Sequence, residues 1–299
     1  MCQMMMIGIR IIQTLRRGLP MTRPPRVKAK PRSWSMTSFC LRSKSFMGMG
    51  YTLPGLRCKP AAALTALALL LFALPFATAG GQPAFGWEEF ERAVRDERIP
   101  LEEARRQIET FRALLPAAYP AREFDGTLVF PLKGYGLRHV GGKRGEGYRP
   151  SRYEFVGPRS RVGHPAQDIF VYDGNQDGLD DRTGEPVAVL AFAEGVVVSA
   201  FAAWAPGLSV NGNGLRGGNY LWIYHPALRL FSYSAHLDRL HVTTGERVAG
   251  GQAVATLGRS GTNAYAERSP THLHFMLLRL EDMRPVNPYP LLQAARETR

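Results

Sequence analysis

Residues 220–235 read YLWIYHPALRLFSYSA, and this stretch indicates the fold of the chain. Two runs rich in aromatic and aliphatic residues, 220–224 and 230–235, flank a short segment that contains Pro226. Short runs of this kind, bounded by proline or glycine, are typical of β-strands. Similar runs occur at 127–131, 187–192, 195–201, 253–257 and 272–278. Because no strand–helix–strand rhythm separates them, we expect a mainly β, antiparallel domain, a sandwich or partly open barrel, over 124–292, followed by a tail at 293–299.

The segment before this domain has a helical pattern. Phe90, Ala93 and Val94 recur at helical spacing, which predicts a short helix from Trp87 to about residue 99. Pro100 then suits the first turn of a second helix, whose apolar face carries Leu101, Ala104, Ile108, Phe111 and Leu115. We expect Pro116 to end this helix. Residues 80–123 therefore predict a helical hairpin that is either a prosegment or an accessory packed on the core.

The positive charge of the chain is concentrated at its N-terminal end. The formal net charge is +13 over 299 residues, from 38 Lys and Arg against 25 Asp and Glu. Residues 1–79 hold 12 of the basic residues and none of the acidic ones, so residues 80–299 carry a net charge of only +1. A nearly neutral body lacks the basic surplus that binds phosphates, and we expect no nucleic-acid partner.

Residues 61–79, AAALTALALLLFALPFATA, have the pattern of an export signal. Basic residues precede this uncharged run, and it ends in a small-x-small site, so we expect a signal peptide over 49–79 and an extracytoplasmic, periplasmic or secreted body. An uncleaved membrane anchor is the alternative, because nineteen apolar or small residues nearly span a bilayer. Residues 1–48 are expected to be a disordered or mis-called upstream extension.

The positions of the cysteines exclude several kinds of site from residues 80–299. Cys2, Cys40 and Cys58 all precede residue 60. A disulfide framework, a cysteine nucleophile and a thiolate metal site are therefore excluded from the body. Any metal bound there needs ligands from His, Asp or Glu.

All seven histidines lie in the expected β domain. His164 and Asp168 form a His-x-x-x-Asp pattern, His236 lies in YSAHL, and His272 and His274 lie in THLHF. Alternate side chains of a strand share a face, so His272 and His274 project together. Two histidines and one carboxylate are typical of catalytic zinc sites. Each pattern alone also fits ordinary surface or hydrogen-bonded histidines. We expect a structural role for His225, which precedes Pro226, and assign none to His139 and His241.

The ordered motifs resemble the lysostaphin/LytM-type zinc metallopeptidases, which cut peptidoglycan peptides. The resemblance covers about residues 130–292 and follows the order of the family's motifs. These motifs are GHPAQDIF (163–170), GVV (195–197), GNY (218–220), YSAHL (233–237), GERV (245–248), LGRSG (257–261), THLHF (271–275) and PVNP (285–288).

The resemblance implies a role for five residues. His164, Asp168 and His274 match the zinc ligands, which predicts one Zn²⁺ per chain. His236 and His272 match two non-ligand catalytic histidines that act on the attacking water or stabilise the tetrahedral intermediate. It also implies a groove over one sheet that takes peptidoglycan peptides. Relatives that have lost activity and serve as amidase activators typically lack some of these five residues, and all five are present here.

An acidic stretch follows the first motif. Asp173, Asn175 and Asp177 occupy positions 1, 3 and 5 of a calcium-loop pattern, with Gly178 at position 6. Position 12 is Gly184 and not Glu, so a complete EF-hand is unsupported. We therefore keep two interpretations, a calcium site and an exposed loop that uses Asp, Asn and Gly for turns.

Three classes of function remain open on the sequence. The leading hypothesis is a zinc endopeptidase that acts on cell-wall peptides. The second is a catalytically inactive cell-wall-binding or amidase-activator module of the same fold. The third is a non-haem iron oxygenase, because two histidines and one carboxylate also suit ferrous iron. Candidates for the lining of a peptide groove are Asn219, Tyr220, Trp222 and Asn263.

Overall fold

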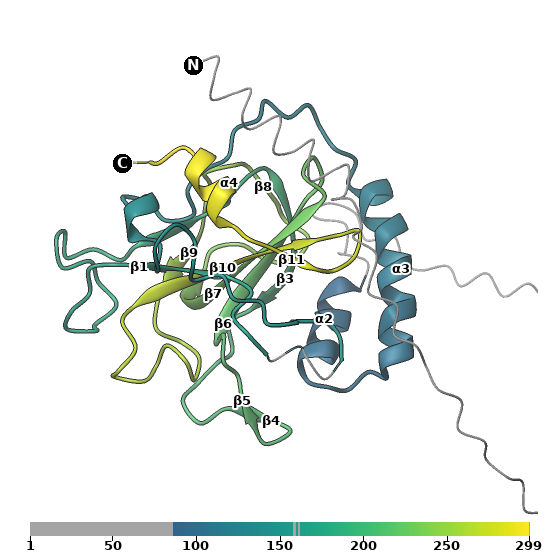
Figure 1. Cartoon of the computed structure of the whole chain (residues 1–299), viewed down its shortest axis with the longest axis horizontal. Helices are drawn as coiled ribbons and strands as arrows, with labels where there is room; N and C mark the ends of the chain where they lie inside the picture. Colours follow the sequence, from purple (N-terminus) through teal and green to yellow (C-terminus); the bar gives the residue numbers. More distant parts are fainter. Residues whose placement is uncertain (1–85, 158–159, 161, 299) are drawn as a thin grey trace, which may run out of the picture. The chain divides into compact units, whose positions relative to one another are not determined.

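The computed structural model describes residues 86–157, 160 and 162–298 (Figure 1). The expected upstream extension at 1–48 and the expected signal peptide at 49–79 lie outside these residues. No helix within the described residues is long and apolar enough to cross a bilayer.

One antiparallel sheet of nine strands forms the centre of the domain. Its strands are β1 (Gln167–Phe170), β2 (Ala188–Leu190), β3 (Gly195–Phe201), β6 (Asn219–His225), β7 (Leu230–Leu240), β8 (Arg247–Val248), β9 (Ala253–Leu257), β10 (His272–Arg279) and β11 (Pro285–Val286). The main path runs β1-β10-β7-β6-β3-β8, while β11 pairs with β10. The first half of β7 pairs with β6 and β10, and its end pairs with β9, which also pairs with β2. The expected mainly antiparallel β fold is confirmed. Strands β4 (Ser209–Val210) and β5 (Asn213–Gly214) form a separate pair.

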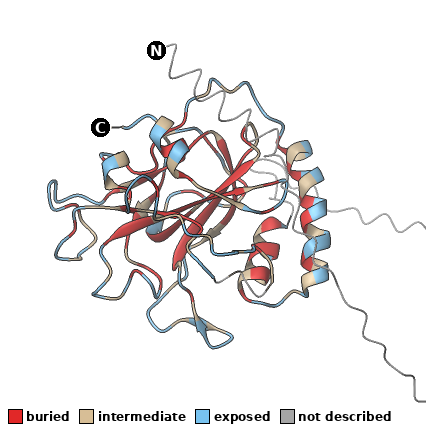
Figure 2. Cartoon of the chain, in the orientation of Figure 1, coloured by how far each residue is buried: buried red, intermediate tan, exposed pale blue. Residues whose placement is uncertain are grey.

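The sheet is apolar on both faces because its strands lie between two cores. In β6, Leu221 and Ile223 face one core, while Tyr220, Trp222 and Tyr224 face the other. This alternation follows from the two-residue period of a strand. The first core also contains residues of β2, β9 and the C-terminal helix α4 (Tyr289–Ala294). Figure 2 shows that the strands are buried along most of their length.

Helices α2 (Trp87–Arg95) and α3 (Leu101–Ala118) cover the second face of the sheet (Figure 1). Trp87 at the start of α2 is fully buried and stacks on Phe231 of β7, with ring centroids 4.4 Å apart. The expected helical hairpin is therefore present and shares a core with the sheet. Its second helix does not end at Pro116 as expected but continues to Ala118. Because Pro116 lies in the last turn, its missing N–H removes only one intrahelical hydrogen bond.

Two other predicted segments differ from the structure. The run 127–131 is buried from Leu128 onward but is not a strand, because Val129 and Phe130 hydrogen-bond to two different partners, Phe192 and Arg296. One hydrogen bond to each of two separate segments does not form the repeated hydrogen-bond ladder of a β-sheet. The expected tail at 293–299 is joined to this same segment, since the Arg296 N–H donates to Leu128 and the Gly134 N–H donates to Thr298.

Candidate metal centre

A glycine positions the first histidine of the site. Gly163 has a φ of 71°, and a Cβ there would lie 2.4 Å from the Pro150 carbonyl oxygen. Only glycine fits both the left-handed backbone and this close approach. The next residue, His164, pairs with Arg149 through two backbone hydrogen bonds. Its side-chain Nδ1 donates to the Gly147 carbonyl at 2.7 Å, which leaves Nε2 as the nitrogen that could bind a metal.

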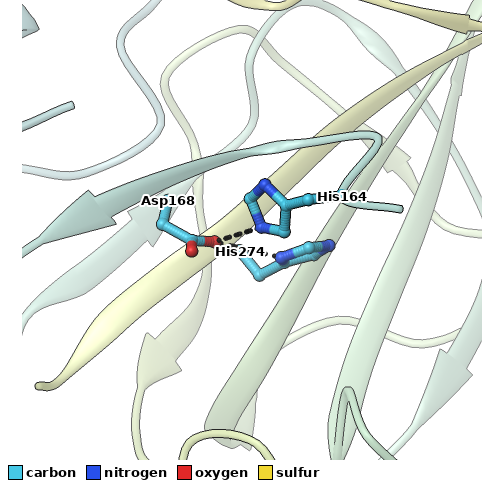
Figure 3. A group of neighbouring side chains, drawn as sticks. All are labelled: His164, Asp168 and His274. Atoms are coloured by element: carbon cyan, nitrogen blue, oxygen red, sulfur yellow. Dashed lines mark hydrogen bonds and ion pairs between the residues drawn. The ribbon is translucent and has the colours of Figure 1, made fainter. Parts of the chain in front are cut away.

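Strand pairing brings the carboxylate to the second histidine. Asp168 of β1 lies directly opposite His274 of β10 in the antiparallel register. Its Oδ1 lies 3.0 Å from His274 Nδ1 and 3.1 Å from His164 Nε2 (Figure 3). The three residues, drawn together in Figure 3, each offer one ligand atom, and these atoms lie within 4.8 Å of one another.

Two further histidines flank this cluster. His272 lies two residues before His274 on β10, and its Nδ1 is 2.7 Å from the Pro270 carbonyl. The Nδ1 of His236 is 2.8 Å from the Ser260 carbonyl. The His236 ring lies 4.8 Å from that of His272 and 5.9 Å from that of His274. The five residues that the sequence singles out are thus brought together from the segment before β1 and from β1, β7 and β10.

An irregularity in β7 places His236 beside the other histidines. Tyr233 and Ala235 face the helical core and Leu237 faces the opposite core, so the alternation reverses at His236. His236 has a φ of 68°, and the pairing of β7 with β6 shifts register there. This is the behaviour of a β-bulge, which re-aims a side chain at the cost of local regularity. Without the bulge, His236 would face away from Tyr233 and Ala235.

The electrostatics of the cluster favour an ionised Asp168 carboxylate and neutral His236 and His272 rings. Burial alone would raise the pKa of Asp168, but hydrogen bonds from His164 and His274 outweigh it and hold this pKa well below its usual range. The pKa of His164 is raised, chiefly by its hydrogen bond to Asp168. Burial lowers the pKa of His272, and burial together with the neighbouring His272 lowers that of His236 to about 3.

The cluster has the donor set of a divalent metal site. Two imidazole nitrogens and one carboxylate oxygen suit zinc, and the carbonyl on the other nitrogen of His164 fixes its tautomer as metal-bound histidines require. The set has three protein ligands, which leaves a fourth position of a tetrahedral ion for water or substrate. The residues present therefore fit Zn²⁺.

A cavity of about 240 Å³ adjoins the cluster. His164, His236 and His274 line it, as do three of the expected groove residues, Tyr220, Trp222 and Asn263. The fourth, Asn219, instead hydrogen-bonds through its side chain to the backbone of Trp204, Leu237 and Asp238. Among the other lining residues are three that the sequence did not single out, Glu91, Arg95 and Tyr153. No local motif marks them, because they reach the cavity only through the tertiary packing of α2 and of the segment that precedes β1.

The acidic loop provides no second metal cluster. Its first acidic residue, Asp173, accepts hydrogen bonds from the backbone N–H groups of Asp177 and Gly178 and from the Thr271 hydroxyl. Within the described residues, the single group of three His, Cys, Asp or Glu side chains that could hold a metal is His164, Asp168 and His274. The calcium interpretation of Asp173, Asn175 and Asp177 therefore has no support, and the turn-forming interpretation accounts for the loop.

The remaining histidines lie away from the cluster. His225 is fully buried and lies within hydrogen-bond distance of the Glu194 carbonyl and the Ser232 hydroxyl. This agrees with the structural role expected of it. His139 interacts with Gly136, and the exposed His241 interacts with Thr256.

Comparison with known proteins places these motifs in a family. Residues 174–288 match the family model described as peptidase family M23. The resemblance to the lysostaphin/LytM-type family is thus confirmed over these residues, which we refer to as the M23 domain. The matched residues contain His236, His272 and His274, whereas His164 and Asp168 precede them.

Curated relatives of the M23 domain include two envelope proteins. The chain is 36% identical over 104 residues to the murein hydrolase activator NlpD of Escherichia coli, which is 34% of this chain and 23% of that protein. It is also 36% identical over 102 residues to the outer membrane antigenic lipoprotein B of Haemophilus influenzae, 34% of this chain and 22% of that protein. The aligned segment thus spans about a quarter of the length of these relatives.

Solved structures similar to the M23 domain include two peptidases. One is the catalytic domain of lysostaphin from Staphylococcus simulans, which is 23% identical to this chain. The match covers 52% of this chain and 95% of that chain, with a TM-score of 0.35. The other is a putative glycyl-glycine endopeptidase from Ruminococcus gnavus, which is 18% identical; the match covers 72% of this chain and 84% of that chain, with a TM-score of 0.40.

Proposed function

We propose that the chain is a zinc-dependent endopeptidase that hydrolyses peptide bonds in bacterial cell-wall peptidoglycan. The observation that carries this proposal is the convergence of five residues on one cluster, three of which line the adjoining cavity. His164, Asp168 and His274 offer ligand atoms within 4.8 Å of one another, and His236 and His272 flank them. The family match supplies the peptidase chemistry that such a set would serve.

The three-residue cluster would hold the metal. When bound there, Zn²⁺ would lower the pKa of a coordinated water and polarise the scissile carbonyl. Asp168 contributes the negative charge of the set, and its low pKa keeps it ionised throughout the neutral range. The Gly147 carbonyl and the Gly163 turn hold the His164 ring in place for this role.

The two flanking histidines would move the proton. Because Nδ1 of each ring donates to a backbone carbonyl, Nε2 of the neutral ring carries the lone pair. Nε2 of either ring can therefore accept a proton and then donate it to a developing oxyanion or to the leaving amine. The lowered pKa values of both rings keep them neutral at neutral pH.

The proposed site of action is outside the cytoplasm. The leader pattern over residues 49–79 supports export. One relative is named an outer membrane lipoprotein, and another is named for its action on murein hydrolases. Both names fit a protein that meets peptidoglycan in the cell envelope.

A second candidate function is activation of a separate murein hydrolase without catalysis by this chain. The name of the curated relative at 36% identity favours it. The complete set of five site residues favours the endopeptidase, because a module that only binds a partner has no need of a metal cluster with two flanking histidines.

Digestion of purified peptidoglycan by the full chain, followed by mass spectrometry of the fragments, separates the two candidates. We expect new peptide termini with the wild type, a loss of more than about a hundredfold with His274→Ala, and no loss with His241→Ala. The control replaces an exposed histidine outside the site. Equal cleavage by wild type and His274→Ala would contradict the endopeptidase. Cleavage only after addition of a separate hydrolase would favour the activator.

A further inference from the structure

Helix α2 contributes a buried carboxyl group to the cavity beside the metal centre. Glu91 is 5% exposed and lines the cavity together with Val94 and Arg95 of the same helix. The Ser199 hydroxyl donates to Glu91 Oε2 at 3.0 Å, and the Tyr220 hydroxyl donates to the same oxygen at 2.9 Å. Within the described residues, both hydrogen bonds to this carboxyl group go to Oε2. As far as the described residues go, Oε1 is left to accept a hydrogen bond from a molecule in the cavity.

The wall that carries Glu91 is a fixed part of the fold. Trp87, one turn before Glu91, stacks on Phe231 and contacts the rings of Phe111 and Phe155. At the other end of α2, the Asn211 side chain donates to the Asp96 carbonyl. Helix α2 therefore lines the cavity as part of the folded domain, and moving it would open a shared hydrophobic core.

Several of the residues that line the cavity with Glu91 are aromatic. Tyr153, Tyr220, Trp222 and Tyr233 line it, and the Tyr220 ring lies 5.4 Å from the Tyr233 ring. A carboxylate among aromatic rings is an environment that recognises organic cations, since the ring faces and the carboxylate both attract positive charge.

We propose that Glu91 and the surrounding tyrosine rings form a subsite that binds a primary ammonium group of the peptide substrate. This subsite rests on the proposed peptide hydrolysis at the neighbouring centre. It gives the helical pair a role in substrate selection, in addition to its role in the core.

The charges around the subsite favour an ammonium group over a carboxylate. Among the described residues, the cations that line the cavity are Arg95 and Arg216. Arg95 is bound to Asp96 by two hydrogen bonds of 2.6 and 3.0 Å and also donates to the Tyr220 hydroxyl. Asp96 therefore offsets part of the positive charge that Arg95 places near Glu91. An incoming carboxylate would face the Glu91 carboxyl group, whereas an ammonium group would complete its hydrogen bonding.

The subsite lies within reach of a peptide bound at the metal centre. The His274 ring is 6.2 Å from the Tyr233 ring, which in turn neighbours the Tyr220 ring that holds Glu91. An extended peptide advances about 3.3 Å per residue, so the ammonium group would belong to a residue within about four positions of the scissile bond.

The test compares two synthetic cell-wall stem peptides that differ at one group. One carries a free side-chain amine, and the other carries the same amine acetylated. Calorimetry on the metal-free full chain measures binding of each without cleavage. We expect acetylation to weaken binding about tenfold in the wild type and less than about twofold in Glu91→Gln. Glu89→Gln makes the same change on the exposed face of α2 and should behave as the wild type.

Three outcomes would overturn the subsite. They are equal binding of both peptides by the wild type, tighter binding of the acetylated peptide, and unchanged discrimination in Glu91→Gln. Failure of the proposed hydrolysis has a different signature, because amine-dependent binding would then persist while the zinc-loaded chain released no new peptide termini. Cleavage that is indifferent to acetylation would overturn the subsite alone. The wild-type comparison needs no folded variant, so the result stands even if Glu91→Gln is unstable.

Discussion

At the scale of single residues, Glu91 illustrates how function and stability conflict. Its carboxyl group lies in the core shared by α2 and the sheet, beside Ser199 and Tyr220. Burial raises its pKa from 4.5 to about 7, although Tyr220, Arg95 and Ser199 act in the opposite direction. A carboxyl group held at this cost is typical of binding and catalytic sites and not of a core selected for stability alone.

The pH dependence of stability follows from this shift. Between pH 4.5 and pH 7 the folded chain binds the Glu91 proton more tightly than the unfolded chain does, so its contribution to stability falls as the pH rises. A shift of this size corresponds to about 3 kcal/mol. We predict that Glu91→Gln increases the free energy of unfolding relative to wild type at pH 8 but much less at pH 4.5, as measured by urea denaturation. A constant difference at both pH values would contradict this assignment.

The sequence revealed some site residues but not others, for a physical reason. His164, Asp168 and His274 lie in short sequence motifs, which can be recognised without knowledge of the tertiary structure. The sequence motif identified His236, but the direction of its side chain depends on a β-bulge at which His236 has a φ of 68°. The regular alternation of side chains along a strand does not predict this bulge. Glu91 belongs to a helix with an ordinary amphipathic pattern, and its partner Ser199 lies 108 residues away in the chain.

At the scale of elements, the helical pair is tied to the sheet by aromatic packing. Trp87 is fully buried between Phe231 and Phe155, with stacked rings on both sides. Replacing a large buried side chain by alanine loses its transfer free energy and leaves a cavity. We predict that Trp87→Ala lowers the free energy of unfolding by about 3–5 kcal/mol, measured by chemical denaturation.

The matched control lies on the exposed side of the same hairpin. Leu114 of α3 is 38% exposed, and Leu114→Ala should change the free energy of unfolding by less than about 1 kcal/mol. A small effect of Trp87→Ala, similar to that of the control, would mean that the helices detach readily from the sheet, as expected of a removable prosegment.

The sequence predicts a strand correctly where its local apolar pattern coincides with the segment that pairs in the sheet. Strands β3 and β9 have the bounds that the sequence predicts, because glycine or turn residues flank their apolar runs. The run 127–131 has the same apolar composition but pairs with two different segments by single bonds. Strand β7 extends to Leu240 because its second half pairs with β9, a long-range partner that no local pattern announces.

At the scale of the whole molecule, the excess positive charge and the candidate site residues lie in different parts of the sequence. The net charge of +13 reflects residues 1–79, whereas the residues of the metal centre lie in a nearly neutral body. The order of strands in the sheet, with β10 between β1 and β7, brings the five site residues together from segments more than 100 residues apart. The central claim is that this assembled centre hydrolyses peptides with one zinc ion per chain.

Titration of the metal-free full chain with Zn²⁺, while new amino termini released from purified peptidoglycan are counted, tests this claim most directly. We predict that release rises in proportion to added zinc and reaches its plateau at one equivalent per chain. His274→Ala should show neither the rise nor tight binding of that equivalent. Stoichiometric zinc binding with no release of amino termini, or release that is independent of zinc, would contradict zinc-dependent hydrolysis at this centre.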